Sequence, residues 1–228
     1  VLCLMSDFQK DIYKKKTKDM DKKKISNISF PENTQFNDIF TKNTSNKKYK
    51  FKTESLAIEL LNNVSKYSTK IYNLLENLNN SSGKSFIYSQ YLEEDYGGTG
   101  LLSIFLEYNG YIKKKLEKSL LTTNSVLEPS LKKDSSQFKG YFIVVDGKTT
   151  EDDFIKYKTF FNSNDNIDGD IIKIIIGTTN MIEGVSLYNV RQIHIIHPWY
   201  NVSRNEQIVG RGVRPVSYTH LRAHETEE

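Results

Sequence analysis

The sequence has very little cysteine and no long apolar run. Among its 228 residues the one cysteine is Cys3. A single thiol can form neither an internal disulfide nor a cysteine-based zinc cluster, which favours an intracellular, reducing compartment. The apolar opening, residues 1–5, is short, and no later run approaches the roughly 20 residues that a membrane-spanning helix needs. We therefore expect a soluble protein with no membrane partner.

The sequence also lacks a complete P-loop, the glycine-rich motif that holds nucleotide phosphates. Gly83, Lys84 and Ser85 match the end of such a motif, but its earlier glycine would fall at position 78, which is Leu78. The tripeptide also precedes a β-rich run, whereas a P-loop follows a strand. This excludes a nucleotide site of the P-loop type within the chain.

What the chain does contain is enough apolar material for one sizeable core. Apolar residues make up 37% and aromatic residues 12% of the sequence, as expected of a globular domain. The formal net charge is +4, and one short stretch holds many of the lysines, at positions 10, 14, 15, 16, 18, 22, 23 and 24. Such a run is compatible with a nucleic-acid partner, but a solvated face or a loose linker gives the same pattern.

The chain changes character near Thr53. Residues 1–52 are polar, with one short helical pattern around Ile12, and we interpret them as a linker or insertion. From Thr53 to Leu78, apolar residues recur at spacings of three and four, which predicts an amphipathic helix.

Strand and helix patterns then alternate. Helices are expected after the turn at 97–100, stopped by Asn109 and Gly110, and over 150–161. We interpret 121–137 and 163–169 as surface loops. Strands are predicted at 85–91, 141–145, 171–176 and 192–197. This rhythm indicates an α/β fold in which a parallel sheet is flanked by helices, and we expect the four strands to be neighbours.

Two motifs carry the chemistry. GTTNMIEGVSL, residues 177–187, follows a predicted strand at its carboxyl end, where open α/β sheets bind ligands. QIVGRGVR, residues 207–214, lies on a predicted helix whose start is marked by Ser203, with Glu206 three residues later. Arginines hold phosphate oxygens in a fixed fork, although a solvated stripe would give the same spacing. One face of that helix carries Arg204, Gln207, Arg211 and Arg214.

These motifs resemble those of superfamily 2 helicases. The first is similar to motif V, and the second matches the QxxGRxxR form of motif VI. The run 85–91 with the turn at 97–100 resembles motif IV and its following loop. With HPWYN at 197–201 and MSDFQKDIY at 5–13, the pattern is most similar to the NTPases and early-transcription helicases of large DNA viruses. The resemblance covers about residues 53–214 and implies the C-terminal, second RecA-like motor domain.

The resemblance implies a role for each matching residue. Arg211 and Arg214 would be arginine fingers that reach NTP phosphates across an interdomain cleft, with Gln207 beside them. Glu183 and Gly184 would lie on the nucleotide side of motif V. At Ser186 the sequence departs from the aspartate of many relatives, so no ribose contact is implied there. Nucleic-acid contacts are implied for Ser89, Gln90, Gly98, Thr178 and Thr179.

The resemblance also implies partners outside the chain. A DEAD- or DEAH-like acidic motif is missing as well as the P-loop, so ATP and Mg²⁺ would be bound mainly by a first motor domain, and we expect the fragment alone to be inactive. The start at Val1 rather than Met suggests the same fragmentary origin. The intact protein would act on DNA or RNA, with RNA polymerase as a further partner, in an infected cell's viral factory or in the virion.

The last residues do not continue the helicase pattern. His220 and His224 stand beside Glu225 with a spacing that zinc ligands also show. However, VSYTHLRAHET, residues 216–226, resembles the translation of a widely used sequencing adapter. We interpret residues 215–228 as a non-native tail and predict no metal site.

Two other functions are compatible with the same motifs. The chain could belong to the motor subunit of a restriction system, in which case a nuclease domain would accompany it in the full-length protein. It could also be a nucleic-acid-binding module that keeps the fold without hydrolysing NTP, in which case the upstream sequence would contain no P-loop.

Overall fold

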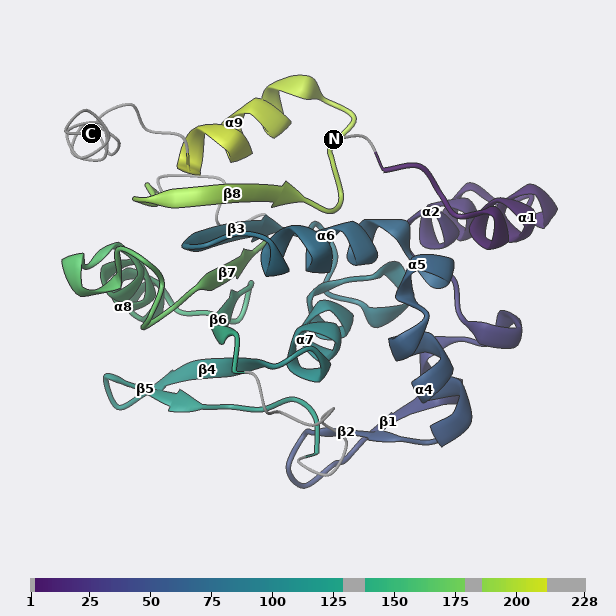
Figure 1. The fold of residues 1–228 in the computed structure, drawn as a ribbon, viewed down its shortest axis with the longest axis horizontal. Coiled ribbons are helices and arrows are strands. Elements are labelled where there is room, and N and C mark those ends of the chain that lie inside the picture. The colour runs from purple at the N-terminus through teal and green to yellow at the C-terminus, as the bar shows by residue number, and fades with distance from the viewer. Residues whose placement is uncertain (1–2, 129–137, 179–185, 213–228) are drawn as a thin grey trace.

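A six-stranded sheet with the strand order β5-β4-β6-β7-β3-β8 forms the centre of the molecule (Figure 1). The computed structural model describes residues 3–128, 138–178 and 186–212. Thr179, Glu183, Gly184, Arg214 and the predicted tail 215–228 therefore lie outside the described residues. The strands are β3 (Lys84–Tyr88), β4 (Tyr111–Glu117), β5 (Leu120–Thr123), β6 (Gly140–Val145), β7 (Ile174–Gly177) and β8 (Val190–Ile195).

The four strands predicted from the sequence are neighbours and parallel. β6 pairs with β7, β7 with β3, and β3 with β8. The apolar runs of β6, β7 and β3 fit this position because these strands are covered on both faces, whereas β8 at the edge is only partly buried. The backbone N–H of Ser89 donates to the carbonyl oxygen of Gly177 at 3.0 Å, so β3 and β7 end at the same edge of the sheet. The predicted α/β class and strand arrangement are confirmed.

Two strands were not predicted. β4 lies parallel to β6, and β5 pairs antiparallel with β4 at the edge of the sheet. Their sequences are rich in lysine and threonine, because an edge strand and its neighbour are only partly covered. The predicted surface loop at 121–137 is therefore wrong in its first residues, which belong to β5.

Helices cover both faces of the sheet (Figure 1). α6 (Thr69–Asn79) and α7 (Thr99–Tyr108) pack in one apolar cluster with Ile87, Phe142 and Ile176. α8 (Glu151–Asn162) and α9 (Val202–Gly212) pack in a second cluster on the other face. The expected start of α8 is confirmed, since the Thr150 hydroxyl accepts a hydrogen bond from the backbone N–H of Asp153 at 3.2 Å.

The predicted helix at 53–78 is three helices. α4 (Glu54–Asn62) and α5 (Val64–Tyr67) precede α6, with breaks at Asn63 and Ser68. The Ser68 hydroxyl caps α6 by accepting from the N–H of Ile71 at 3.2 Å, and it donates to the carbonyl oxygen of Asn27 at 2.6 Å. All three helices bury apolar residues in the same cluster, so their spacing continues across the breaks.

Residues 3–52 are folded onto this cluster rather than forming a loose linker. They contain α1 (Asp7–Lys15), α2 (Asp19–Asn27), η1 (Pro31–Asn33), α3 (Phe36–Ile39) and the hairpin of β1 (Phe40–Lys42) and β2 (Tyr49–Phe51). The linker interpretation is thus corrected to a folded segment, because the apolar residues are concentrated in a short stretch that the overall polar composition hides. The core includes Ile28, Phe30, Phe36, Ile39 and Phe40.

The predicted surface loop at 163–169 is also more ordered than expected. It contains the short helix η4 (Asn164–Asn166), and the side chain of Asn166 is fully buried. Its amide nitrogen donates to the carbonyl oxygens of Phe161 and Ile172 at 3.1 and 3.0 Å, and its oxygen accepts from the N–H groups of Ile171 and Ile172 at 2.8 and 3.0 Å. Asn166 therefore joins the end of α8 to the segment that leads into β7. No helix in the described parts of the chain is long and apolar enough to cross a membrane.

Candidate nucleotide and nucleic-acid site

Three of the residues predicted to contact nucleic acid, Ser89, Gln90 and Thr178, lie where β3 and β7 end. Ser89 is fully buried, and its hydroxyl lies 2.9 Å from the carbonyl oxygen of Tyr91 and 3.1 Å from Nδ1 of His197. Thr178 is 4% exposed, and its N–H donates to the carbonyl oxygen of Val145. Gln90 is half-buried. The Ser89 hydroxyl thus has partners inside the domain. A contact between Ser89 and nucleic acid stays a prediction, and the buried position of the residue does not favour it.

Gly98 is needed for close packing. A Cβ at this position would lie 2.6 Å from the carbonyl oxygens of Tyr91 and Glu93. The N–H of Gly98 donates to the same oxygen of Glu93 at 2.9 Å. Gly98 therefore lets the loop after β3 fold against the start of α7, and its predicted nucleic-acid contact remains untested.

His197 ties the end of β8 to the loop after β3. It is 3% exposed, its Nε2 lies 3.1 Å from the carbonyl oxygen of Tyr96, and its ring packs edge-on against Tyr91 at 4.9 Å. This is the structural role that its place at the end of a buried strand suggests. Burial lowers the pKa of His197 to about 3, an effect to which the charge of Lys70 adds.

The depressed pKa of His197 predicts a loss of stability in mild acid. The ordinary pKa of histidine is 6.5, so below that pH His197 is protonated in the unfolded chain. In the folded state the same side chain stays neutral down to about pH 3. The free energy of unfolding should be independent of this group above pH 6.5, and should fall below it by about 1.4 kcal/mol per pH unit. We expect urea titrations between pH 7 and 5 to show that the free energy of unfolding of His197→Asn depends less steeply on pH than that of the wild type. The difference should correspond to the uptake of about one proton on unfolding. An unchanged slope in that variant would show that the buried imidazole is protonated in the folded state.

The loop that leads from β8 into α9 is closed by Asn205. Its side-chain oxygen accepts from the N–H of Trp199, and its side-chain nitrogen donates to the carbonyl oxygen of the same residue, both at 2.9 Å. The sequence did not single out Asn205; its position near a helix start is a weak signal. The helix begins at Val202, before the predicted Ser203, and the Asn201 side chain accepts from the N–H of Ser203 at 2.9 Å.

Trp199 packs as an anchor for α9. Its indole N–H donates to the Tyr88 hydroxyl at 2.7 Å, which joins the loop to β3. The guanidinium of Arg204 lies over its ring at 4.3 Å. These contacts give Trp199 a packing role, in which Arg204 covers the indole.

The other described residues of motif VI are differently placed along α9. Gln207 is exposed, and Arg211 is half-buried. The Nε of Arg211 is buried and has no hydrogen-bond partner among the described residues. The space beside Gly210 is open, with no atom within 4 Å of the position that a Cβ would take. A guanidinium nitrogen that lacks a hydrogen-bond partner among the described residues fits the binding of a phosphate oxygen.

The end of motif V is held against this helix. The N–H of Leu187 donates to the carbonyl oxygen of Arg211 at 2.9 Å. The Asn162 side chain, at the end of α8, donates to the carbonyl oxygen of Ser186 and accepts from the N–H of Tyr188, at 2.9 and 2.8 Å. The structure thus brings the described part of motif V beside Arg211. No group of acidic, histidine or cysteine residues that could hold a metal ion occurs in the described ranges.

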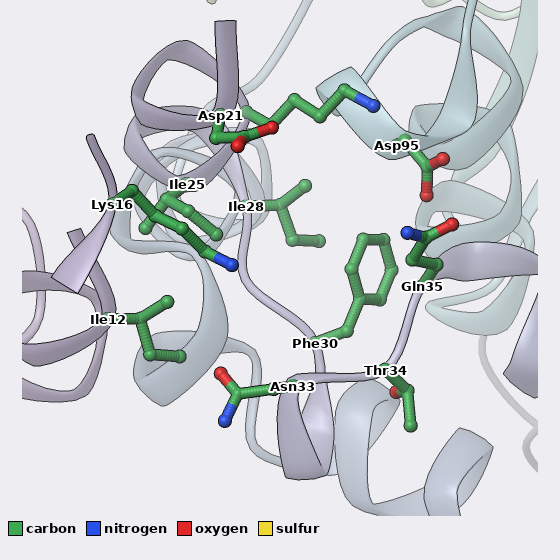
Figure 2. A pocket seen from close by; sticks show the side chains of 11 residues that line it. Ile12, Lys16, Asp21, Ile25, Ile28, Phe30, Asn33, Thr34, Gln35 and Asp95 are labelled. Carbon is green, nitrogen blue, oxygen red and sulfur yellow. The ribbon is translucent and has the colours of Figure 1, made fainter. Parts of the chain in front are cut away.

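A small cavity lies away from these motifs, where α1 and α2 meet the segment 30–35 (Figure 2). Ile12, Ile28 and Phe30 line it with Lys16 and Asp95 among its polar neighbours. Its volume of about 110 Å³ is well below the roughly 300 Å³ at which ligand pockets begin, so we do not assign it a nucleotide.

Known proteins related to the chain are viral and plasmid helicases. No family model matches it. It is 31% identical over 96% of its length to a protein of Invertebrate iridescent virus 3 named "Putative helicase 087L", and 29% identical over 94% to "Putative ATP-dependent RNA helicase R563" of Acanthamoeba polyphaga mimivirus. It is 29% identical over 68% to "Termination factor NPH-I homolog" of African swine fever virus. The chain is a superfamily 2 helicase-like domain related to those of large DNA viruses.

The chain spans only part of the length of these relatives. It spans 22% of the iridescent virus protein, 35% of the mimivirus protein and 24% of the African swine fever virus protein. The mostly parallel sheet flanked by helices agrees with a RecA-like α/β domain. The fold, the order of the motifs and these relatives therefore point in the same direction.

Proposed function

We propose that the intact protein is an ATP-dependent helicase or translocase, and that this chain is its second motor domain. The observation that carries the proposal is Arg211, whose buried Nε faces no described partner on a helix held against the end of motif V. ATP hydrolysis builds negative charge on the transferring phosphoryl oxygens, and an arginine from a facing domain offsets it. Arg211 and Arg214 would supply that charge, with Gln207 beside them.

The chain's own part in the cycle would be to aim these arginines and to hold one side of the nucleic-acid strand. When bound, ATP with Mg²⁺ supplies the phosphoanhydride that is hydrolysed, and we place most of its contacts on a first motor domain. Closure of the two domains would bring α9 to the phosphates while the loops after β3 and β7 hold the strand. Glu183, Gly184 and Thr179 would complete motif V in this arrangement.

The names of the relatives support a transcription-associated role. Two of them are called RNA helicase and termination factor, so DNA or RNA and a viral RNA polymerase are the partners that we propose. The reducing interior of an infected cell, or the virion, would be the location. A restriction-system motor shares the same residues, and a non-hydrolysing binding module shares the fold; neither has a relative among those described above.

The proposal is tested by ATP hydrolysis in the full-length protein. We expect turnover that rises on addition of single-stranded DNA, duplex DNA or RNA, and the most effective of the three identifies the substrate. Nucleic-acid binding without any hydrolysis would leave the binding-module alternative in its place.

Two neighbouring glycines of α9 should separate stability from activity. A methyl group at Gly210 meets no atom of the described residues within 4 Å, so Gly210→Ala should stabilise the helix by up to about 1 kcal/mol. It should nevertheless lower ATP turnover, since we expect the facing domain to pack against this open side of α9, where the methyl group would lie. In Gly212→Ala the new Cβ lies 2.8 Å from Cδ1 of Ile193, and stability should fall. Melting temperature and turnover are measured for both; full turnover in Gly210→Ala would mean that only solvent occupies this space.

A further inference from the structure

A groove of about 500 Å³ lies beside the predicted strand contacts and is lined by residues from several separate elements. Thr99 and Gly100 at the start of α7 and Asp146 after β6 place it at the same edge of the sheet as the ends of β3 and β7. Its other walls are β4, the segment 124–126 and the β1–β2 hairpin. We call it the lysine groove, after Lys42, Lys47, Lys113, Lys115 and Lys148.

Two features bring the lysines to one groove: the alternation of side chains along β4, and the attachment of the β1–β2 hairpin to the segment 124–126. Lys113 and Lys115 lie two residues apart on β4 and so share a face, while Lys114 packs over the Tyr141 ring at 3.7 Å. The hairpin supplies Lys42 and Lys47 from the opposite wall. Neither wall was expected from the sequence, which predicted a linker or insertion at the hairpin and assigned no element to the residues of β4.

The walls of the groove are fixed to the core. In the hairpin, the N–H of Tyr49 donates to the carbonyl oxygen of Val126 at 2.7 Å. The buried carboxylate of Glu107, on α7, accepts from the N–H groups of Val126 and Leu127 at 2.9 and 3.0 Å. The Tyr49 hydroxyl also donates to Glu94 in the loop after β3. The groove is therefore a preformed feature of the domain.

The charge balance of the groove favours an anion. Five lysines line it against three carboxylates, those of Glu93, Glu94 and Asp146. Two of these carboxylates have internal partners: Glu94 accepts from the Tyr49 hydroxyl, and Asp146 accepts from the N–H of Lys148 at 2.9 Å. The ion pairs of the described residues join Lys10 to Asp7 and Lys66 to Glu59, so the groove's ammonium groups are not neutralised by ion pairs there.

Burial and like charge also act on Lys113 inside the groove. Burial lowers its pKa, the carboxylates of Glu107 and Asp146 oppose that effect, and the charges of Lys42 and Lys115 add to it. The charges of Lys42 and Lys115 thus act on Lys113, and an anion bound between these three ammonium groups would interact favourably with each of them.

We propose that the lysine groove binds the phosphodiester backbone of the nucleic-acid strand as it continues beyond the ends of β3 and β7. This inference rests on the proposed function. Several separate ammonium groups suit successive phosphates, because lysine acts as a point charge toward each phosphate oxygen. The Thr99 hydroxyl and the Asn124 amide supply further hydrogen-bonding capacity, while the lining offers no aromatic platform for a stacked base except Tyr49, which is buried.

The test is the salt dependence of nucleic-acid binding by the full-length protein. The probe is a fluorescent single-stranded oligonucleotide of about thirty nucleotides, with its duplex as a second probe. Lys42→Gln with Lys115→Gln removes one charge from each wall at exposed positions. Each lost phosphate contact should reduce the slope of log K against log salt by about 0.7 to 0.9, so we expect the double variant to lower it by roughly 1.5. Lys42→Arg with Lys115→Arg should retain most of the slope.

The matched control is Lys14→Gln with Lys15→Gln, which removes the same charge from exposed positions of α1 outside the groove. A slope that falls equally in both double variants, or in neither, would overturn the assignment of the groove. If the wild-type protein still hydrolyses ATP in response to nucleic acid, the proposed function survives that result. A wild-type protein that neither binds the probes nor responds to them would overturn both.

Discussion

Replacing Arg211 by alanine in the full-length protein is expected to lower kcat for nucleic-acid-stimulated ATP hydrolysis by on the order of 10³-fold. The guanidinium would act on charge that develops in the transition state, so its loss should affect turnover more than ATP binding. Stability should change little, because the buried Nε makes no hydrogen bond within the described residues. We expect the same of Arg214→Ala.

Two variants make this result specific. Arg211→Lys should recover little activity, since one ammonium cannot reproduce the planar fork of donors. Arg204→Ala, on the same helix, should act instead through stability, because Arg204 covers the Trp199 ring. Turnover and melting temperature are measured for all three. Arg211→Ala with near-wild-type turnover would remove this residue from catalysis and leave the domain a binding role.

Asn166→Asp is expected to reduce the free energy of unfolding by about 3 kcal/mol or more. The substitution keeps the size of the side chain but replaces the amide that donates to two buried carbonyl oxygens with an oxygen that repels them. Each buried polar group left unpaired costs about 1 to 3 kcal/mol, and a buried charge costs more.

Asn164→Asp is the matched control for that experiment. Asn164 is exposed in the same short helix, so the identical chemical change should alter stability by no more than about 0.5 kcal/mol. Urea denaturation of both variants at neutral pH measures the difference. Equal losses would mean that the four hydrogen bonds of Asn166 are not formed in solution.

The parallel part of the sheet could be predicted because burial on both faces leaves a direct mark on the sequence. The runs at 141–145 and 171–176 are almost wholly apolar, and they form adjacent strands of the sheet. The start of α8 could also be predicted from the sequence, since the cap at Thr150 is a local interaction. The position of motifs IV and V at one edge followed from the parallel arrangement alone.

The parts that could not be predicted depend on contacts between distant residues. β4 and β5 are too exposed to show an apolar run, and the breaks near Asn63 and Ser68 leave the helical spacing intact. The buried state of Ser89 depends on His197, which lies 108 residues further along the chain. The lysine groove was not predicted because one of its walls comes from the segment interpreted as a linker or insertion, and the other from β4, for which no element was predicted.

The contacts that hold α9 in place suggest how ATP hydrolysis and nucleic-acid binding could be coupled in a motor protein. His197 holds the end of β8 to the loop after β3, Trp199 holds the following loop to Tyr88, and Leu187 holds the last turn of the helix. A pull exerted by a nucleic-acid strand on the loop after β3 would therefore act, through the hydrogen bonds of His197 and Trp199, on the loop that leads into α9, the helix that carries Arg211. Mechanical load and the alignment of the arginine would then change together, without any rearrangement inside the domain.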